Sequence, residues 1–188
     1  MSEYVEIERR FFVDGRNARP WRESEHRSEI AQHYLDSSLF KNNGNELCYA
    51  GTFALVQMKN EEKALFEATE DWTSRIRFTQ DSVTLTLKGK RTHASATELE
   101  WNISLELAEE IINSKRHPSI TKTRYHWKGK DGMVWEVDEF EGGLAGLVLA
   151  EIELPNIDHN VTLPEWLGVE LTGLHQWSNS TLALTEVS

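Results

Sequence analysis

Charged residues recur in pairs along this chain, with the two members two positions apart and one residue between them. Side chains two positions apart on a β-strand lie on the same face of the sheet. The alternation therefore predicts strands that have one charged face and one largely apolar face. The pairs, in chain order, are Glu6/Glu8, Arg75/Arg77, Lys88/Lys90, Glu98/Glu100, Lys122/Arg124, Glu136/Asp138 and Glu151/Glu153.

Eight segments show this strand alternation: residues 4–13, 32–38, 73–79, 83–89, 96–103, 120–128, 133–140 and 147–154. Short turns join the third to the fourth and the sixth to the seventh, which predicts antiparallel hairpins. Residues 104–115 predict an amphipathic helix with Ser104 as its cap. Residues 20–31 and 179–187 are also expected to be helical. Residues 39–72 predict an inserted hairpin and helix, and a surface embellishment is favoured over a lid.

The charged faces are expected to point inward. A single charged pair is usually solvated surface, but here the pairs segregate by sign within each strand. The apolar run 144–150 before Glu151 would also be unnecessary on a surface strand. We therefore expect a mainly β (α+β) fold, in which a closed eight-stranded antiparallel β-barrel has a charged lumen and helices packed outside. Eight strands enclose room for about one small ligand.

Composition narrows the class of protein. The 188 residues fit a single domain, 1–188. Lysine plus arginine number 20 against 31 acidic residues, so the net charge is −11 and nucleic-acid or anionic-membrane binding is not expected. One cysteine excludes an internal disulfide, and no apolar run reaches the ~18 residues of a membrane span. A cytoplasmic location is expected.

Buried charges need compensation, because desolvation costs several kcal/mol per ion. The arginine and lysine pairs would meet a strongly anionic ligand, since guanidinium forks match phosphate geometry. The carboxylate pairs would meet a divalent metal, since hard cations bind carboxylate and phosphate oxygens. A small-molecule triphosphate that arrives with Mg²⁺ or Mn²⁺ satisfies both requirements.

The first pair and the residue after it, Glu6-x-Glu8-x-Arg10, resemble the ExExK signature of the CYTH, or triphosphate tunnel metalloenzyme, superfamily. The later pairs follow in the family's order, and the local strings are similar to those of its bacterial inorganic-triphosphatase-like branch. The resemblance covers nearly the whole chain. It implies metal-dependent hydrolysis of a triphosphate, above all inorganic tripolyphosphate, inside a β-tunnel.

Site residues follow from the same resemblance. It implies catalytic roles for Glu6, Glu8 and Arg10. It implies metal ligands at Glu6, Glu8, Glu136, Asp138, Glu151 and Glu153. It implies substrate binding by Arg10, Arg75, Arg77, Lys88, Lys122 and Arg124. Further candidates are Glu98, Glu100, Lys90 and Tyr34. Arg10 stands where the family has lysine, and because arginine keeps its proton it can hold phosphate or orient water but cannot act as a base.

Other functions remain open at this point. The same tunnel could belong to a class IV adenylyl cyclase that makes cyclic AMP from ATP. It could also belong to a thiamine or nucleoside triphosphatase, or to a non-catalytic triphosphate or polyphosphate sensor. The sequence does not choose the metal, and it leaves both a monomer and a homodimer open.

Overall fold

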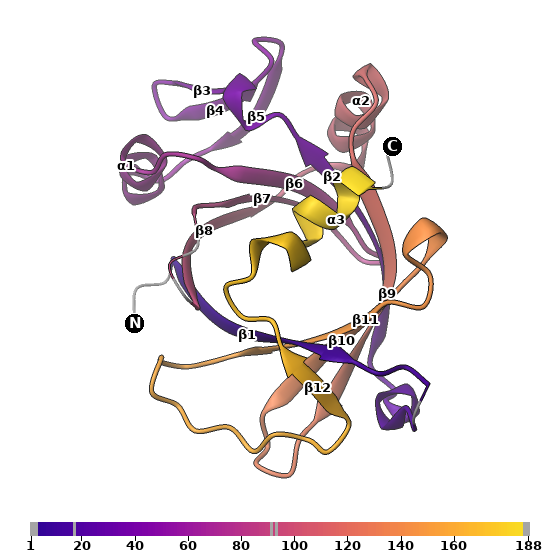
Figure 1. Ribbon diagram of the computed structural model, residues 1–188. Coiled ribbons are helices and arrows are strands. Elements are labelled where there is room, and N and C mark those ends of the chain that lie inside the picture. Colours follow the sequence, from indigo (N-terminus) through magenta and orange to yellow (C-terminus); the bar gives the residue numbers. More distant parts are fainter. Residues whose placement is uncertain (1–3, 17, 91, 93, 186–188) are drawn as a thin grey trace.

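A closed β-barrel dominates the computed structural model, which describes residues 4–16, 18–90, 92 and 94–185 (Figure 1). The ring order is β1, β11, β10, β9, β2, β6, β7 and β8, and β8 pairs with β1 to close it. All pairings are antiparallel, which confirms the predicted eight-stranded barrel. The strands are β1 (Val5–Val13), β2 (Arg27–Leu35), β6 (Thr73–Phe78), β7 (Val83–Lys88), β8 (Ser95–Asn102), β9 (Ser119–Lys128), β10 (Val134–Phe140) and β11 (Val148–Glu153).

The outer faces of the barrel strands are apolar and buried. Ile76, Leu85 and Leu99 belong to one outer cluster, and Val137 and Ile152 to another. All five side chains are fully buried. Because successive side chains on a strand alternate between its two faces, the charged residues between them point into the lumen.

The inserted segment covers part of this outer face. It forms a separate sheet of β3 (Phe40–Asn43), β4 (Glu46–Tyr49) and β5 (Phe53–Gln57), followed by α1 (Asn60–Ala68). Leu47 and Tyr49 are buried in the same cluster as Ile76 and Leu85. Figure 1 shows this unit and α2 outside the ring. The segment therefore acts as packing for the barrel wall.

Helix α2 (Leu105–Ser114) also packs outside the barrel. Ser104 caps it as predicted, because its Oγ accepts a hydrogen bond from the Leu107 amide at 3.2 Å. Ala108 and Ile111 are fully buried in the outer cluster.

The C-terminal segment takes a different position. Residues 171–185, hereafter the C-terminal cap, contain a 3₁₀ turn, η4 (His175–Trp177), and the helix α3 (Asn179–Thr185). Leu182 packs in one cluster with Tyr34, Phe140 and Leu149. These three residues share the inner face of their strands with the charged residues. The cap thus lies across one mouth of the barrel, as Figure 1 shows.

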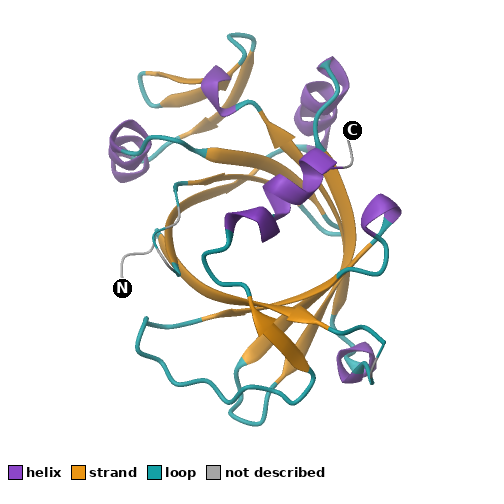
Figure 2. Cartoon of the chain, in the orientation of Figure 1, coloured by secondary structure: helices purple, strands orange, loops and turns teal. Residues whose placement is uncertain are grey.

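Three local predictions differ from the structure. Strand β2 begins at Arg27 rather than at residue 32, and only Pro20–Glu23 of the predicted helix 20–31 is helical, as a 3₁₀ turn. A ninth strand, β12 (Leu167–Glu170), pairs with β1 outside the ring (Figure 2). The predicted helix 179–187 is observed over Asn179–Thr185, and its last two positions, 186 and 187, lie outside the described residues.

None of the helices in the described part of the chain has the length and apolar character that a bilayer crossing requires.

Candidate active site

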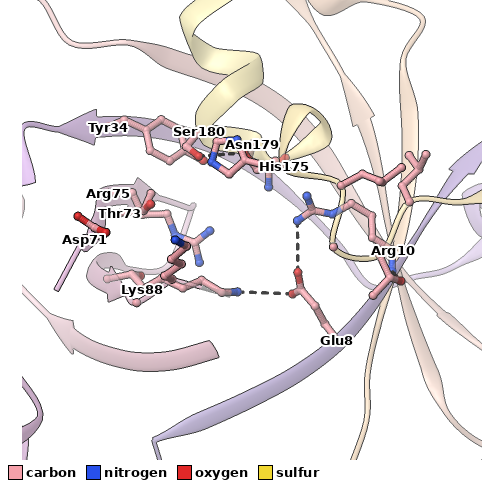
Figure 3. A pocket seen from close by; sticks show the side chains of 18 residues that line it. Glu8, Arg10, Tyr34, Asp71, Thr73, Arg75, Lys88, His175, Asn179 and Ser180 are labelled. Atoms are coloured by element: carbon pink, nitrogen blue, oxygen red, sulfur yellow. Dashed lines mark hydrogen bonds and ion pairs between the residues drawn. The ribbon is translucent and has the colours of Figure 1, made fainter. Parts of the chain in front are cut away.

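A half-open cavity of about 490 Å³ lies between the inner wall of the barrel and the C-terminal cap (Figure 3). Barrel strands contribute charged side chains to it, and the cap contributes polar ones. Glu8 and Arg10 come from β1, Arg75 from β6 and Lys88 from β7. Lys90 also lines the cavity, beyond the end of β7. The cavity therefore has a predominantly cationic wall.

A chain of ion pairs crosses the inner face from β1 to β9. Arg10 Nε donates to Glu151 Oε1 at 2.6 Å, and Arg124 Nη2 donates to Glu151 Oε2 at 3.1 Å. Arg124 also binds Asp138 through two hydrogen bonds of 2.6 and 2.7 Å. Lys122 Nζ lies 2.5 Å from Asp138 Oδ2. Because β10 separates β9 from β11, the Arg124–Glu151 contact requires both side chains to point into the lumen.

Burial and neighbouring charges perturb this network. Burial alone would raise the pKa of Glu151, but Arg10 and Arg124 hold that pKa well below its usual value. Burial lowers the pKa of Lys122 to about 8, although Asp138 favours its charged form. Glu136 pairs with Arg124 and lies 3.6 Å from His126 Nε2. Most charges on this side of the lumen are thus compensated by one another.

A second group of charges surrounds Lys88. Its Nζ forms an ion pair with Glu6, and it lies 3.6 Å from Glu8 Oε2 and 3.3 Å from Glu98 Oε2. Three carboxylates therefore lie near one ammonium, and Glu8 also pairs with Arg10 at 3.3 Å. Burial, followed by repulsion from Glu151, raises the pKa of Glu8. The negative charges of Glu151 and Glu6 therefore disfavour the charged form of Glu8, while Lys88 and Arg10 favour it.

Arg75 and Arg77 differ from the other lumen cations. Within the described ranges neither forms an ion pair, and the Nε atom of each is buried without a hydrogen-bond partner. Burial, followed by the nearby charges of Arg75 and Arg124, lowers the pKa of Arg77. A buried N–H donor without an acceptor is costly. These two residues are therefore candidates for binding an anionic group.

The sequence profile of the CYTH domain family matches residues 60–183, which is more than half of the chain. The chain belongs to the CYTH domain family. An inorganic triphosphatase of Acetivibrio thermocellus is 41% identical over 114 residues, which cover 60% of this chain and 72% of that protein. An inorganic triphosphatase of Nitrosomonas europaea is 33% identical over 93 residues, which cover 48% of this chain and 62% of that protein.

A solved structure of an inorganic triphosphatase has the same overall architecture as this CYTH chain. The two are 26% identical and superpose with a TM-score of 0.58, over 95% of this chain and 94% of the other.

The C-terminal cap supplies one wall of the CYTH cavity, and the charged-pair pattern does not identify it. Its contribution comes from Leu171, Thr172, Gly173, Leu174, His175, Ser178, Asn179 and Ser180. None of these residues is charged at neutral pH unless His175 is protonated. They also lie outside the eight predicted strands. The only sequence signal for them is the closing string ELTG…WSNSTLA, which resembles that of the family.

Arg10 connects this cap to the barrel through hydrogen bonds. Its backbone amide donates to Thr172 Oγ1 at 3.0 Å, and its carbonyl accepts from the Leu171 amide at 2.7 Å. Its Nη1 donates to the Trp177 carbonyl at 2.8 Å. The side chain thus spans from the carboxylate of Glu151 to the cap.

The predicted site residues divide into three groups. Those that line the cavity are Glu8, Arg10, Tyr34, Arg75, Lys88 and Lys90. Those that lie on the inner face beyond the cavity are Glu6, Arg77, Glu98, Lys122, Arg124, Glu136, Asp138 and Glu151. Those with exposed side chains are Glu100 and Glu153.

Proposed function

We propose that this CYTH chain hydrolyses inorganic tripolyphosphate inside the barrel. The observation that carries the proposal is the lack of a bonding partner for the guanidinium Nε atoms of Arg75 and Arg77 among the described residues. Both side chains are half-buried, and neither forms an ion pair in the part of the chain that the structure describes. The two related proteins named inorganic triphosphatases support the same substrate.

A chain of phosphoryl groups suits the cationic wall. Arg75 lines the cavity, and Arg77 lies on the same face of β6, two residues further from the cap. Guanidinium groups bind phosphate oxygens through two parallel hydrogen bonds. Lys88 and Lys90 on the adjoining wall add point charges. One linear polyanion could contact these residues together.

The carboxylates of the lumen fit a divalent metal, which we propose to be Mg²⁺ or Mn²⁺. Glu8 and Glu153 lie opposite each other on neighbouring strands. Burial, and then the negative charges of Glu136, Glu98 and Glu8, raises the pKa of Glu153. Among the residues with described positions, no three potential metal ligands are already gathered together. Binding would therefore draw side chains toward the ion.

The ligands that we propose for this metal are Glu6, Glu8, Glu136, Asp138, Glu151 and Glu153. Glu151 and Asp138 are held by Arg10, Lys122 and Arg124, so those cations orient their oxygens. When bound, a divalent metal neutralises phosphate charge and lowers the pKa of a coordinated water.

The chain's own residues would promote in-line attack of water on a terminal phosphoryl group. The Glu8 carboxylate faces the cavity, where it can accept a hydrogen bond from the attacking water and orient it. Arg75 and Arg77 would stabilise negative charge on the equatorial phosphoryl oxygens. Arg10 keeps its proton and holds Glu8 and Glu151 in place.

A substrate panel tests the choice of triphosphate. Purified protein would be incubated with tripolyphosphate, ATP and thiamine triphosphate, each with Mg²⁺ and with Mn²⁺. We expect phosphate release with the highest kcat/KM on tripolyphosphate and no cyclic AMP from ATP. Cyclic AMP as the main product, or a higher kcat/KM on ATP or thiamine triphosphate, would contradict the proposal.

A further inference from the structure

The cavity wall contains a buried polar side chain that the charged-pair pattern does not include. Asn179 is only 7% exposed, and it lines the cavity together with Tyr34 and Arg75 (Figure 3). No residue with a described position donates a hydrogen bond to its Oδ1, which is buried. A buried amide oxygen that accepts no hydrogen bond is unfavourable, so the asparagine at this position calls for a reason.

Capping of α3 does not provide that reason. The preceding residue, Ser178, performs the capping, because its Oγ accepts a hydrogen bond from the Thr181 amide at 3.2 Å. The Ser178 carbonyl also accepts from the Leu182 amide at 2.9 Å. The helix thus begins properly without the Asn179 side chain.

Two neighbours in the cavity are also able to donate hydrogen bonds. Gln32 Nε2 donates to the Tyr34 hydroxyl oxygen at 3.3 Å, which leaves the hydroxyl proton available for another acceptor. Arg75 has a buried Nε that finds no hydrogen-bond partner among the described residues. An asparagine amide group can rotate to present its two N–H donors. Asn179, Tyr34 and Arg75 together can therefore surround one acceptor group with three kinds of donor.

From this arrangement we infer that Asn179 is a substrate-binding residue that hydrogen-bonds one phosphoryl group of the substrate, the group held by Arg75. The inference rests on the proposed function, since it assigns a further contact within that site. It gives the C-terminal cap a direct role in substrate affinity. A neutral amide adds a donor here without adding to the crowding of positive charge around Arg75 and Arg77.

The test uses two variants of the full chain, Asn179→Asp and Asn179→Ala. The aspartate has the same shape but directs negative charge at the substrate, and the alanine removes the amide. Asn113→Asp is the matched control, because Asn113 is exposed on α2 outside the barrel. The measurements are KM and kcat for tripolyphosphate, together with the Tm of each protein.

We expect KM to rise about tenfold in Asn179→Ala and further in Asn179→Asp, with a smaller change in kcat. The control should keep the wild-type KM. Because the amide oxygen accepts no hydrogen bond from a residue with a described position, the alanine variant should keep the wild-type Tm or exceed it, whereas a structural asparagine would lower it. A KM within twofold of wild type in both Asn179 variants overturns the inference, whatever their Tm. A wild-type protein without tripolyphosphatase activity would instead overturn the proposed function.

Discussion

Arg10 Nη1 donates a hydrogen bond of 2.8 Å to the backbone carbonyl of Trp177, which joins the first barrel strand to the C-terminal cap. The same guanidinium binds Glu151 through Nε at 2.6 Å and Nη2 at 2.5 Å. A planar guanidinium can direct separate N–H groups at these two acceptors. Lysine, which the family has at this position, carries one ammonium and cannot reproduce this geometry.

Replacement of Arg10 by lysine should therefore loosen the cap while keeping the charge. We expect kcat/KM for tripolyphosphate to fall about tenfold and Tm to fall by a few degrees, since one or two hydrogen bonds to a charged group are lost. Steady-state kinetics and thermal unfolding measure both effects. Arg9→Lys, which alters the neighbouring arginine on the outer face, is the control. An Arg10→Lys variant with wild-type kcat/KM would show that the cap contact is dispensable.

Arg75 is predicted to reduce stability and to increase affinity for substrate. Arg75→Met takes away a half-buried charge that forms no ion pair within the described ranges, so Tm should stay the same or rise. The KM for tripolyphosphate should rise about ten- to a hundredfold, because hydrogen bonds to a charged group are lost. Arg116→Met, at an exposed position, controls for loss of a positive charge. A lower Tm with unchanged KM would assign Arg75 a structural role instead.

The buried pair Lys122–Asp138 predicts a pH dependence of stability. The pKa of Lys122 is about 8 in the folded protein, against about 10.4 in an unfolded chain. Between these values the unfolded chain binds more protons than the folded protein. The contribution of this lysine to stability is therefore lowest below pH 8 and rises as pH increases toward 10.

Lys122→Met lacks this titration, and Asp138 keeps its two hydrogen bonds from Arg124. The free energy of unfolding of the wild type, minus that of the variant, should increase between pH 7.5 and pH 9.5. Urea unfolding at the two pH values measures this difference. A difference that is constant or decreases would show that the pKa of Lys122 is not lowered.

The inserted segment is predicted to support the barrel and not the chemistry. Leu47 is fully buried against the outer face, and Asp71 is the only residue of 39–72 that lines the cavity in the part of the chain that the structure describes. Leu47→Ala should lower the free energy of unfolding by about 2–5 kcal/mol. The kcat/KM measured well below Tm should stay within twofold of wild type. A large loss of kcat/KM in folded protein would instead indicate that the inserted segment is a lid, the alternative weighed in the sequence analysis.

The barrel was predictable because charged and apolar residues alternate along each strand. This alternation gives each strand a charged inner face and an apolar outer face. It failed where tertiary pairing decides the structure. Residues 27–29 are polar and follow a proline-led turn, yet they belong to β2 because they pair with β9. The short edge strand β12, which contains Gly168, exists through its pairing with β1.

The charged set of the candidate site was predictable, but its internal pairing was not. The contact between Arg124 and Glu151 joins strands that are not neighbours, and so does the contact between Lys88 and Glu8. Such pairs depend on the curvature and closure of the barrel. No pattern within one strand distinguishes Arg75, which has no described partner, from Arg124, which has several.

Phosphate release from tripolyphosphate by wild type and Glu8→Gln is the most direct test of the account. The substitution keeps the size of a side chain that lines the cavity and removes its negative charge. With Mg²⁺ or Mn²⁺, the wild type should release phosphate, and Glu8→Gln should lose nearly all turnover while remaining folded by circular dichroism. A wild type that is inactive with both metals, or a Glu8→Gln variant with wild-type kcat, would contradict the central claim.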